Sequence, residues 1–256
     1  MNYLENGTSE LIEIMGDPTE ILTYYYLAKD TSPGDMTLEL EDSWGLQPRS
    51  TLNIQEELLS IDEVKGRVIY LSEPIVGEYQ EGEALVSNQT VPSVPVPRFK
   101  RITYEILEFI RKVRVPRYTV VNYGSLVKHF DEEFFVVGID PGDASYALTL
   151  REINANVTIK RPTRKQGSTA WGSTIEDETQ YTEVKAYLQH NLADLPFVQG
   201  LGNVPTGSFL AIIPRIYQVQ YEDKVIDQED VYKVVGFNRY TNKNLLTLIL
   251  NIDASK

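Results

Sequence analysis

The fold is decided by a stretch of 36 residues that occurs twice, 98 residues apart. The first copy, 115–150, reads VPRYTVVNYGSLVKHFDEEFFVVGIDPGDASYALTL, and the second, 213–248, reads IPRIYQVQYEDKVIDQEDVYKVVGFNRYTNKNLLTL. The copies share 11 identical residues without a gap, among them the motifs Pro-Arg, Val-Val-Gly and Leu-Thr-Leu. Unrelated segments of this length share about two identities, so the match indicates a tandem duplication.

Each copy has the pattern of a small antiparallel β structure. In the first copy, Phe134–Ile139 and Ala147–Ile153 are extended stretches on either side of Asp-Pro-Gly-Asp, which favours a tight turn. Gly138 and Gly236 end the Val-Val-Gly motifs and predict a strand bend, or alternatively a ligand close to the backbone. We therefore expect a mainly β protein with tandem-duplicated small barrel-like modules, SH3-like or OB-like, and one or two short helices.

The composition is that of a folded protein that needs no cross-links. Hydrophobic residues make up 42% of the 256 residues, and there is no cysteine, which excludes disulfides and thiolate metal sites. A chain of this length can bury a sufficient core without them. It has no long apolar run and begins with an acidic, polar segment, so we expect neither a membrane span nor a secretory signal.

The net charge of −13 is spread unevenly along the chain. Residues 1–97 carry four Lys and Arg against 18 Asp and Glu, whereas residues 98–165 carry 13 against eight. An acidic body disfavours nucleic acid as the main partner. The basic middle segment is either a solvated surface or a face that meets an acidic neighbour in head-to-tail subunit contacts.

These features divide the chain into three predicted parts. Residues 1–97 form an acidic β region that ends in Val91–Pro97, a proline-rich stretch predicted to be an extended linker. Residues 98–165 hold an amphipathic helix and the first β module. Residues 166–256 hold a connector with a short helix and the second module. The short helix is predicted from the spacing of Tyr181, Val184, Tyr187 and Leu188.

Two segments are candidate interfaces. In residues 101–113, apolar side chains recur on one face of a predicted helix with basic flanks, which either packs on its own barrel or docks on an adjacent subunit. Residues 160–173 are predicted to be a long polar loop, either disordered or in contact with a partner surface or a glycan. The candidate interface residues are Ile102, Ile106, Phe109, Ile110, Arg161, Arg164, Lys165 and Trp171.

No motif indicates catalysis, a bound metal or a cofactor. His129 and His190 lie in neither a nucleophile-elbow nor a His-Glu-x-x-His context, and the sequence has no EF-hand loop, P-loop or dinucleotide fingerprint. We therefore expect a protein that is not an enzyme. The alternative is a glycan hydrolase that uses two of the 37 acidic residues, whose separation a sequence does not give.

The duplicated module, a strand, an acidic or Asn-rich turn and a Leu-Thr-Leu strand, resembles the small β-barrel insertions of tailed-bacteriophage virion proteins. The short strands Arg67–Leu71 and Leu148–Leu150, the acidic composition and the absence of cysteine are similar to neck, tail and baseplate components. The resemblance implies a homo-oligomeric virion protein, assembled in the host cytoplasm, that contacts copies of itself and other virion structural proteins. The alternative is a glycan- or receptor-binding module that uses Trp171, Tyr24 and Tyr26.

Overall fold

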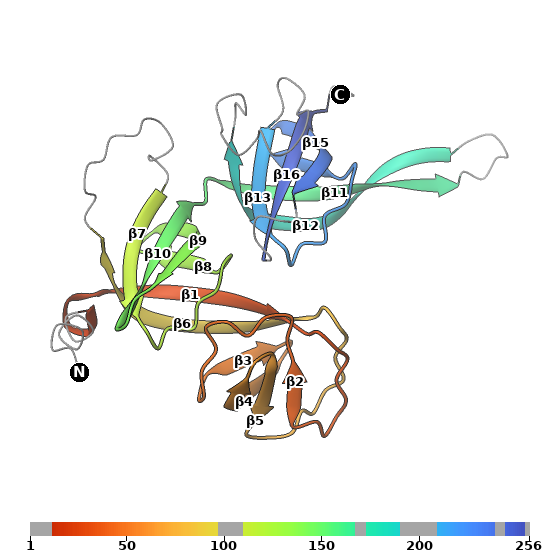
Figure 1. Cartoon of the computed structure of the whole chain (residues 1–256). Helices are drawn as coiled ribbons and strands as arrows, with labels where there is room; N and C mark the ends of the chain where they lie inside the picture. The colour runs from red at the N-terminus through yellow and green to blue at the C-terminus, as the bar shows by residue number, and fades with distance from the viewer. Residues whose placement is uncertain (1–11, 97–109, 167–172, 190–208, 239–243, 254–256) are drawn as a thin grey trace. The chain divides into compact units, whose positions relative to one another are not determined.

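The computed structural model describes residues 12–96, 110–166, 173–189, 209–238 and 244–253 (Figure 1). The chain divides into two compact units, Met1–Glu152 and Ile153–Lys256. Apart from one helical turn at 12–15, the regular secondary structure of the described residues is β strand. This confirms the prediction of a mainly β protein.

The first unit is built on a closed, six-stranded antiparallel barrel. Because strands alternate their side chains between two faces, one face of each strand fills the barrel interior. The interior is mainly apolar, with Phe134, Val136 and Leu148 among its fully buried side chains. Around the barrel the strands are β1 (Asp17–Tyr26), β6 (Ala84–Pro95), β7 (Ile110–Pro116), β10 (Ser145–Glu152), β9 (Glu132–Pro141) and β8 (Leu126–His129), which pairs back to β1.

The second unit is a barrel with the same strand order. When the strands of each barrel are counted in chain order, strands 1 and 2 pair with each other, and strand 3 pairs with strands 2 and 6. Its strands, in order around the barrel, are β11 (Ala155–Gln166), β12 (Ser173–Gln189), β13 (Phe209–Pro214), β16 (Leu245–Ile252), β15 (Asp230–Asn238) and β14 (Lys224–Asp227). The duplicated barrel modules predicted from the repeat are thus confirmed, and each is a complete six-stranded barrel.

The register shows that the duplication includes the first strand pair of each barrel, which lies outside the sequence repeat. Ile21 of β1 faces Val127, and Ile159 of β11 faces Val225, which is the repeat equivalent of Val127. The residues of β1 and β11 therefore correspond one to one. The partner strands β6 and β12 correspond in the same way at the start of each hairpin.

The turns of the two barrels also match in backbone conformation. Phe130 and Gln228, one repeat apart, are the first residues of equivalent two-residue hairpin loops and have φ angles of 55° and 52°. Gly124 and Glu222, also one repeat apart, have φ angles of 83° and 71°. Because positive φ is costly for residues other than glycine, this agreement indicates that the turn geometry is fixed by the barrel and not by the local sequence.

The Val-Val-Gly motifs form β-bulges, as the sequence predicted. In β9 the pairing with β10 passes from Gly138 to Val136 without a partner for Val137. In β15 the pairing with β16 skips Val235 in the same way. A Cβ atom on Gly138 would lie 3.1 Å from two side-chain atoms of Thr149, so close packing across the strands accounts for the glycine.

Gln228→Gly is expected to raise the free energy of unfolding by about 0.5–1 kcal/mol, because glycine adopts the positive φ of this position without steric cost. Chemical denaturation of the purified protein measures this change. The matched control is Glu229→Gly at the next loop position, where the same gain is not expected. An equal effect of both substitutions would show that the backbone conformation of residue 228 is not the cause.

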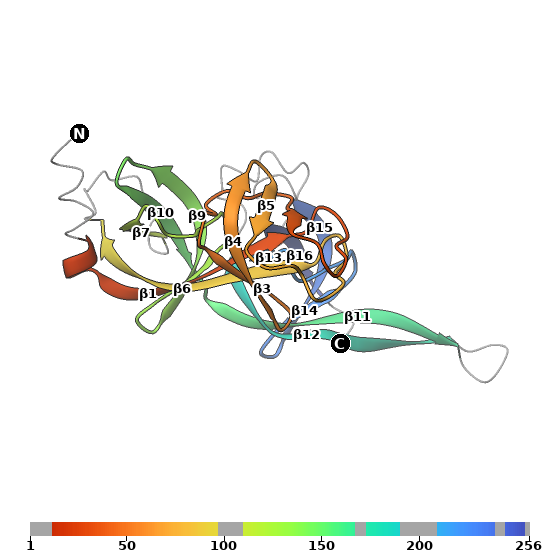
Figure 2. The same ribbon diagram turned by 90° about the horizontal axis from the view of Figure 1, so that it is seen from below.

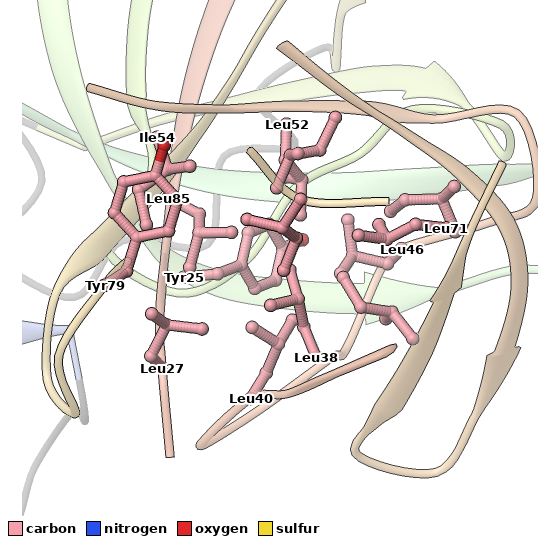
Figure 3. Close-up of a cluster of buried hydrophobic side chains, with 14 of the residues drawn as sticks. Tyr25, Leu27, Leu38, Leu40, Leu46, Leu52, Ile54, Leu71, Tyr79 and Leu85 are labelled. Carbon is pink, nitrogen blue, oxygen red and sulfur yellow. The ribbon is translucent and has the colours of Figure 1, made fainter. Parts of the chain in front are cut away.

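Four further strands are inserted between β1 and β6. They pair in the order β3-β4-β5-β2, and β3 joins the edge of β6 where Asn53 faces Val86. Their core includes Leu52, Ile61 and Ile69 and also takes in Tyr25 of β1 and Leu85 of β6 (Figure 3). The inserted strands are β2 (Thr37–Glu39), β3 (Thr51–Ile54), β4 (Glu57–Lys65) and β5 (Val68–Leu71).

The predicted boundary at Val91–Pro97 is wrong. Residues up to Pro95 belong to β6, which pairs with β1 and with β7, so residues 1–97 supply two strands of the first barrel. The chain divides into its two units between Glu152 and Ile153 instead. The prolines fit the strand because Pro92 faces Pro18 of β1, which places two missing N–H groups at one point of the ladder.

Three other local predictions are corrected by the strands. The predicted helix over 101–113 is wrong for residues 110–113, which lie in β7, and 101–109 lie outside the described residues. The helix predicted near 181–188 is wrong because these residues belong to β12. The predicted loop at 160–173 is in large part the hairpin of β11 and β12, and residues 167–172 lie outside the described residues.

A buried tyrosine fixes the segment that leads from β5 to β6. The Tyr79 hydroxyl donates to Glu57 at 2.6 Å, and the N–H groups of Val76 and Gly77 donate to the same carboxylate. Desolvation raises the Glu57 pKa, but the hydrogen bonds from Tyr79, Val76 and Gly77 together lower it. Burial, followed by the bond to Glu57, raises the pKa of Tyr79 to about 12.

Tyr79→Phe is expected to lower the free energy of unfolding by about 1.5 kcal/mol near pH 8, because a hydrogen bond to a charged carboxylate is lost. The folded pKa lies above the ordinary value of 10.0. The stabilisation by Tyr79 is therefore complete below pH 10 and is lost as the pH rises towards 12. Denaturation of both proteins at several pH values measures this difference, and a difference independent of pH would contradict the assignment.

Candidate functional site

The hairpin of β11 and β12 extends beyond the barrel to which it belongs (Figures 1 and 2). β14 pairs with β11 only from Thr158 to Lys160, and β13 pairs with β12 only from Tyr187 to Gln189. Residues 161–166 and 173–178 pair with each other, from Arg161–Glu178 to Gln166–Ser173, and with no other described strand. We call these two segments the arm. It has two outer edges whose backbone groups have no partner strand among the described residues.

An ion pair fixes β11 at the base of the arm. The Arg161 guanidinium donates from Nε and Nη2 to the two carboxylate oxygens of Asp223, at 2.9 Å each, and Nη2 also donates to the Gln218 carbonyl at 2.8 Å. The Asp223 side chain is 1% exposed and also accepts the N–H of Gln220. The hydrogen bonds to Asp223 raise the pKa of Arg161, so the guanidinium stays charged. Arg161 therefore anchors the arm.

A second ion pair fixes β12. Lys224 of β14 donates to Asp177 at 2.8 Å and lies 3.3 Å from Asp253. The hydrogen bond to Asp177 is the main cause of the raised pKa of Lys224. Between the strands, the Thr163 hydroxyl donates to the Glu176 carbonyl at 3.1 Å. Both strands of the arm are thus tied to the barrel, and the ladder between them continues to Gln166 and Ser173.

The two strands of the arm carry opposite charges. Basic residues lie on β11, at 160, 161, 164 and 165, and acidic residues lie on β12, at 176, 177 and 178. The residues 176–179 on β12 are exposed. One outer edge of the arm is therefore acidic, and the other follows a basic strand.

The first barrel shows what covers the equivalent hairpin extension. β1 and β6 also continue past the strands that flank them in the barrel, but there the inserted strands pack on the extension and β3 joins the β6 edge at Val86. Val86 is paired with Tyr24 in the first hairpin, and Asp177 is paired with Pro162 in the second. Because Tyr24 and Pro162 are equivalent positions of β1 and β11, Val86 and Asp177 are equivalent as well. In the second barrel no described strand lies at this place.

The structure separates the candidate interface residues. Arg161 is at the base of the arm, and Arg164 and Lys165 follow in β11, opposite Ile175 and Thr174. Ile110 is the first residue of β7 in the first unit. Outside the described residues lie Ile102, Ile106, Phe109 and Trp171, and also His190. The acidic strand 176–178 was missed, although its charge, opposite to that of 160–165, is visible in the sequence.

Two other groups that the sequence singled out are buried in the first barrel. His129 Nδ1 lies 2.9 Å from the Thr19 hydroxyl, which is 2.6 Å from the Ser93 hydroxyl. The three residues are buried, and no carboxylate is a hydrogen-bond partner of His129 among the described residues. Tyr26 is only 5% exposed, so it presents no ring on which a sugar could stack, and Tyr24 is half-buried.

Comparison with known proteins gives no relative: no protein-family model, curated protein or solved structure matches this chain. In the part of the chain that the structure describes, no helix is long and apolar enough to cross a membrane. No group of three or more potential metal ligands comes together among the described residues. The geometry of the arm therefore carries the functional argument.

Arg161→Ala is expected to lower the free energy of unfolding by about 3 kcal/mol, because it leaves the Asp223 carboxylate buried without its partner. Chemical denaturation measures the loss. The control is Arg161→Thr with Asp223→Ser, which reproduces Thr23 and Ser125, the hydrogen-bonded pair at the equivalent place in the first barrel. The double variant is expected to recover most of the loss, and failure to do so would contradict the equivalence of the two sites.

Proposed function

We propose that the protein is a structural subunit that assembles with copies of itself through the arm. The observation that carries the proposal is that the two edges of the arm have no partner strand among the described residues, and that the strands along these edges carry opposite charges in the sequence. An uncovered edge is a template for pairing with another chain. A two-stranded ribbon is also marginally stable by itself, so the arm gains stability when a further strand joins it.

The charges select which edges meet. Two copies that joined β11 to β11, or β12 to β12, would place like charges side by side, which opposes association. Joining β11 of one copy to β12 of the next places basic residues beside acidic ones. Since β11 and β12 run in opposite directions, this antiparallel pairing makes the two arms point the same way. Each added copy then leaves one edge of each type free.

Such a head-to-tail contact is heterologous, because two different surfaces meet. Repeated contacts of this kind give a ring when the rotation closes and a helical filament when it does not. The precedent within the chain supports the acidic edge as a receptor, because β3 joins the first hairpin at Val86, the position equivalent to Asp177. We place this assembly in a tailed-phage particle on the resemblance of the duplicated modules to virion proteins.

Reversal of the charge on either edge is expected to weaken self-association about tenfold or more. One variant combines Arg164→Glu and Lys165→Glu in β11, and the other combines Glu176→Lys and Glu178→Lys in β12. Light scattering across a concentration series measures the molar mass of each. An equimolar mixture of the two variants is expected to assemble, because each altered edge then meets its opposite charge.

Two outcomes would contradict the proposal. One is a wild-type protein that stays monomeric at every concentration. The other is a mixture of the two variants that remains dissociated while each variant alone melts as the wild type does. Equal melting temperatures are needed in the second case because they show that the barrel and the arm anchors are intact. Lys65→Glu, an exposed change in the inserted strands, is the control for altered charge elsewhere.

A further inference from the structure

A pocket of about 250 Å³ lies in the first unit. Residues 47–51, which lead from β2 into the first residue of β3, form one side. Residues 87–89 of β6, together with Tyr118 and Val120, which precede β8, form the remainder. The side chains used below are those of Gln47, Arg49, Asn88, Gln89 and Tyr118.

The pocket differs in charge from the region around it. Residues 1–97 carry 18 acidic residues, yet none of the residues that line the pocket is acidic. Of the four basic residues in this region, three form ion pairs: Lys29 and Arg67 with Glu39, and Lys65 with Glu63. The fourth is Arg49, which lines the pocket.

Arg49 has no ion-pair or side-chain hydrogen-bond partner among the residues that the structure describes. Its backbone N–H donates to the Ile61 carbonyl, and its φ of 72° lies in the left-handed region, which glycine would adopt without strain. The Asn88 amide likewise has no hydrogen-bond partner among the described residues. Arg49 and Asn88 are both exposed and line the same pocket, so water is their partner in the free protein and a ligand can take its place.

Two glutamines are held in fixed orientations. Gln47 Nε2 donates to the Arg117 carbonyl at 2.9 Å, and Gln89 Nε2 donates to the Val120 carbonyl at 2.6 Å. Because a carbonyl accepts each bond, the amide nitrogen must be the donor. The Oε1 atom of each side chain therefore remains to accept a hydrogen bond from a ligand hydroxyl.

Tyr118 completes the pocket with a ring that is 49% exposed. Burial raises the pKa of its hydroxyl, and the Glu13 carboxylate raises it further. The hydroxyl therefore stays protonated at neutral pH and can donate a hydrogen bond. The pocket thus offers one cation, the Tyr118 hydroxyl, three Ser and Thr hydroxyls and three amide side chains around a space of about 250 Å³.

We propose that this pocket binds a small carboxylated sugar of the hexuronate type. A guanidinium binds a carboxylate through two parallel hydrogen bonds, and amide oxygens accept bonds from sugar hydroxyls. The volume suits one sugar unit, since ligand sites for larger molecules are about 300–1,000 Å³. The proposal is independent of assembly through the arm, because the pocket and the arm belong to different units.

Isothermal titration of the full chain with galacturonate tests the proposal, with galactose as the neutral probe. We expect galacturonate to bind and galactose to bind at least tenfold more weakly. Trigalacturonate separates a free acid from one unit of a polymer: equal or tighter binding of the trimer indicates that the pocket accepts a chain. Absence of galacturonate binding at millimolar concentrations, or equal binding of galactose, would overturn the proposal.

Arg49→Gly is the informative variant, because it removes the guanidinium and also relieves the positive φ. We expect at least a tenfold loss of galacturonate affinity with a melting temperature equal to or above that of the wild type. The matched control is Arg67→Ala, an exposed arginine of the same unit paired with Glu39, which should leave binding unchanged. A lower melting temperature for Arg49→Gly, or unchanged binding, would instead assign Arg49 a structural or incidental role.

Discussion

The architecture depends on one constraint: the first two strands of each barrel form a hairpin longer than the barrel requires. β1 and β6 pair over ten residues, but β8 covers β1 over only four of them, from Thr19 to Leu22. β11 likewise pairs with β14 over three residues and with β12 along nearly its whole length. A hairpin extension that leaves its barrel has exposed edges, and it must either acquire a cover or serve as a contact. The first copy has the cover within its own chain, and the second copy has none among the described residues.

The same constraint explains how far the sequence could predict the fold. The repeat 115–150 and 213–248 spans strands 7–10 and 13–16, where no insertion changes the spacing, so a constant offset revealed it. The repeat of the first hairpins escaped detection because four strands are inserted between β1 and β6. The number of residues that separates β1 from β11 therefore differs from the number that separates β6 from β12, so no constant offset links the two hairpins. The domain boundary was therefore placed at a proline-rich strand, although β6 is needed to close the barrel.

The wrong helix near 181–188 has a physical cause in the bulges of β12. Val184, Ala186 and Leu188 alternate along β12 and belong to the core of the second barrel, whereas Tyr187, which is also buried, lies outside that cluster. The pairing with β11 shifts its register near Ile159. As a result Tyr181 packs against the same core, although strict alternation from Val184 would place residue 182 there instead. Tyr181, which is partly buried, and the buried Val184 are three residues apart and so imitate the spacing of a helix. A bulge inside a strand defeats a prediction based on period alone, because the period holds only on each side of the bulge.

The candidate sites differ in how visible they are in the sequence. The arm is made of two neighbouring segments with opposite charges. Its charge pattern can therefore be read from the sequence once 161–166 and 173–178 are known to pair. The pocket cannot be read in this way, because it joins residues near 48, 88 and 119 that only the inserted strands and the first barrel bring together. The connection between the inserted strands β2 and β3 supplies Gln47 and Arg49 to the pocket. The insertion that covers the first hairpin therefore also forms one side of the pocket. The two equivalent hairpins thus present surfaces of different chemistry, because the second has no partner strand for its extension among the described residues.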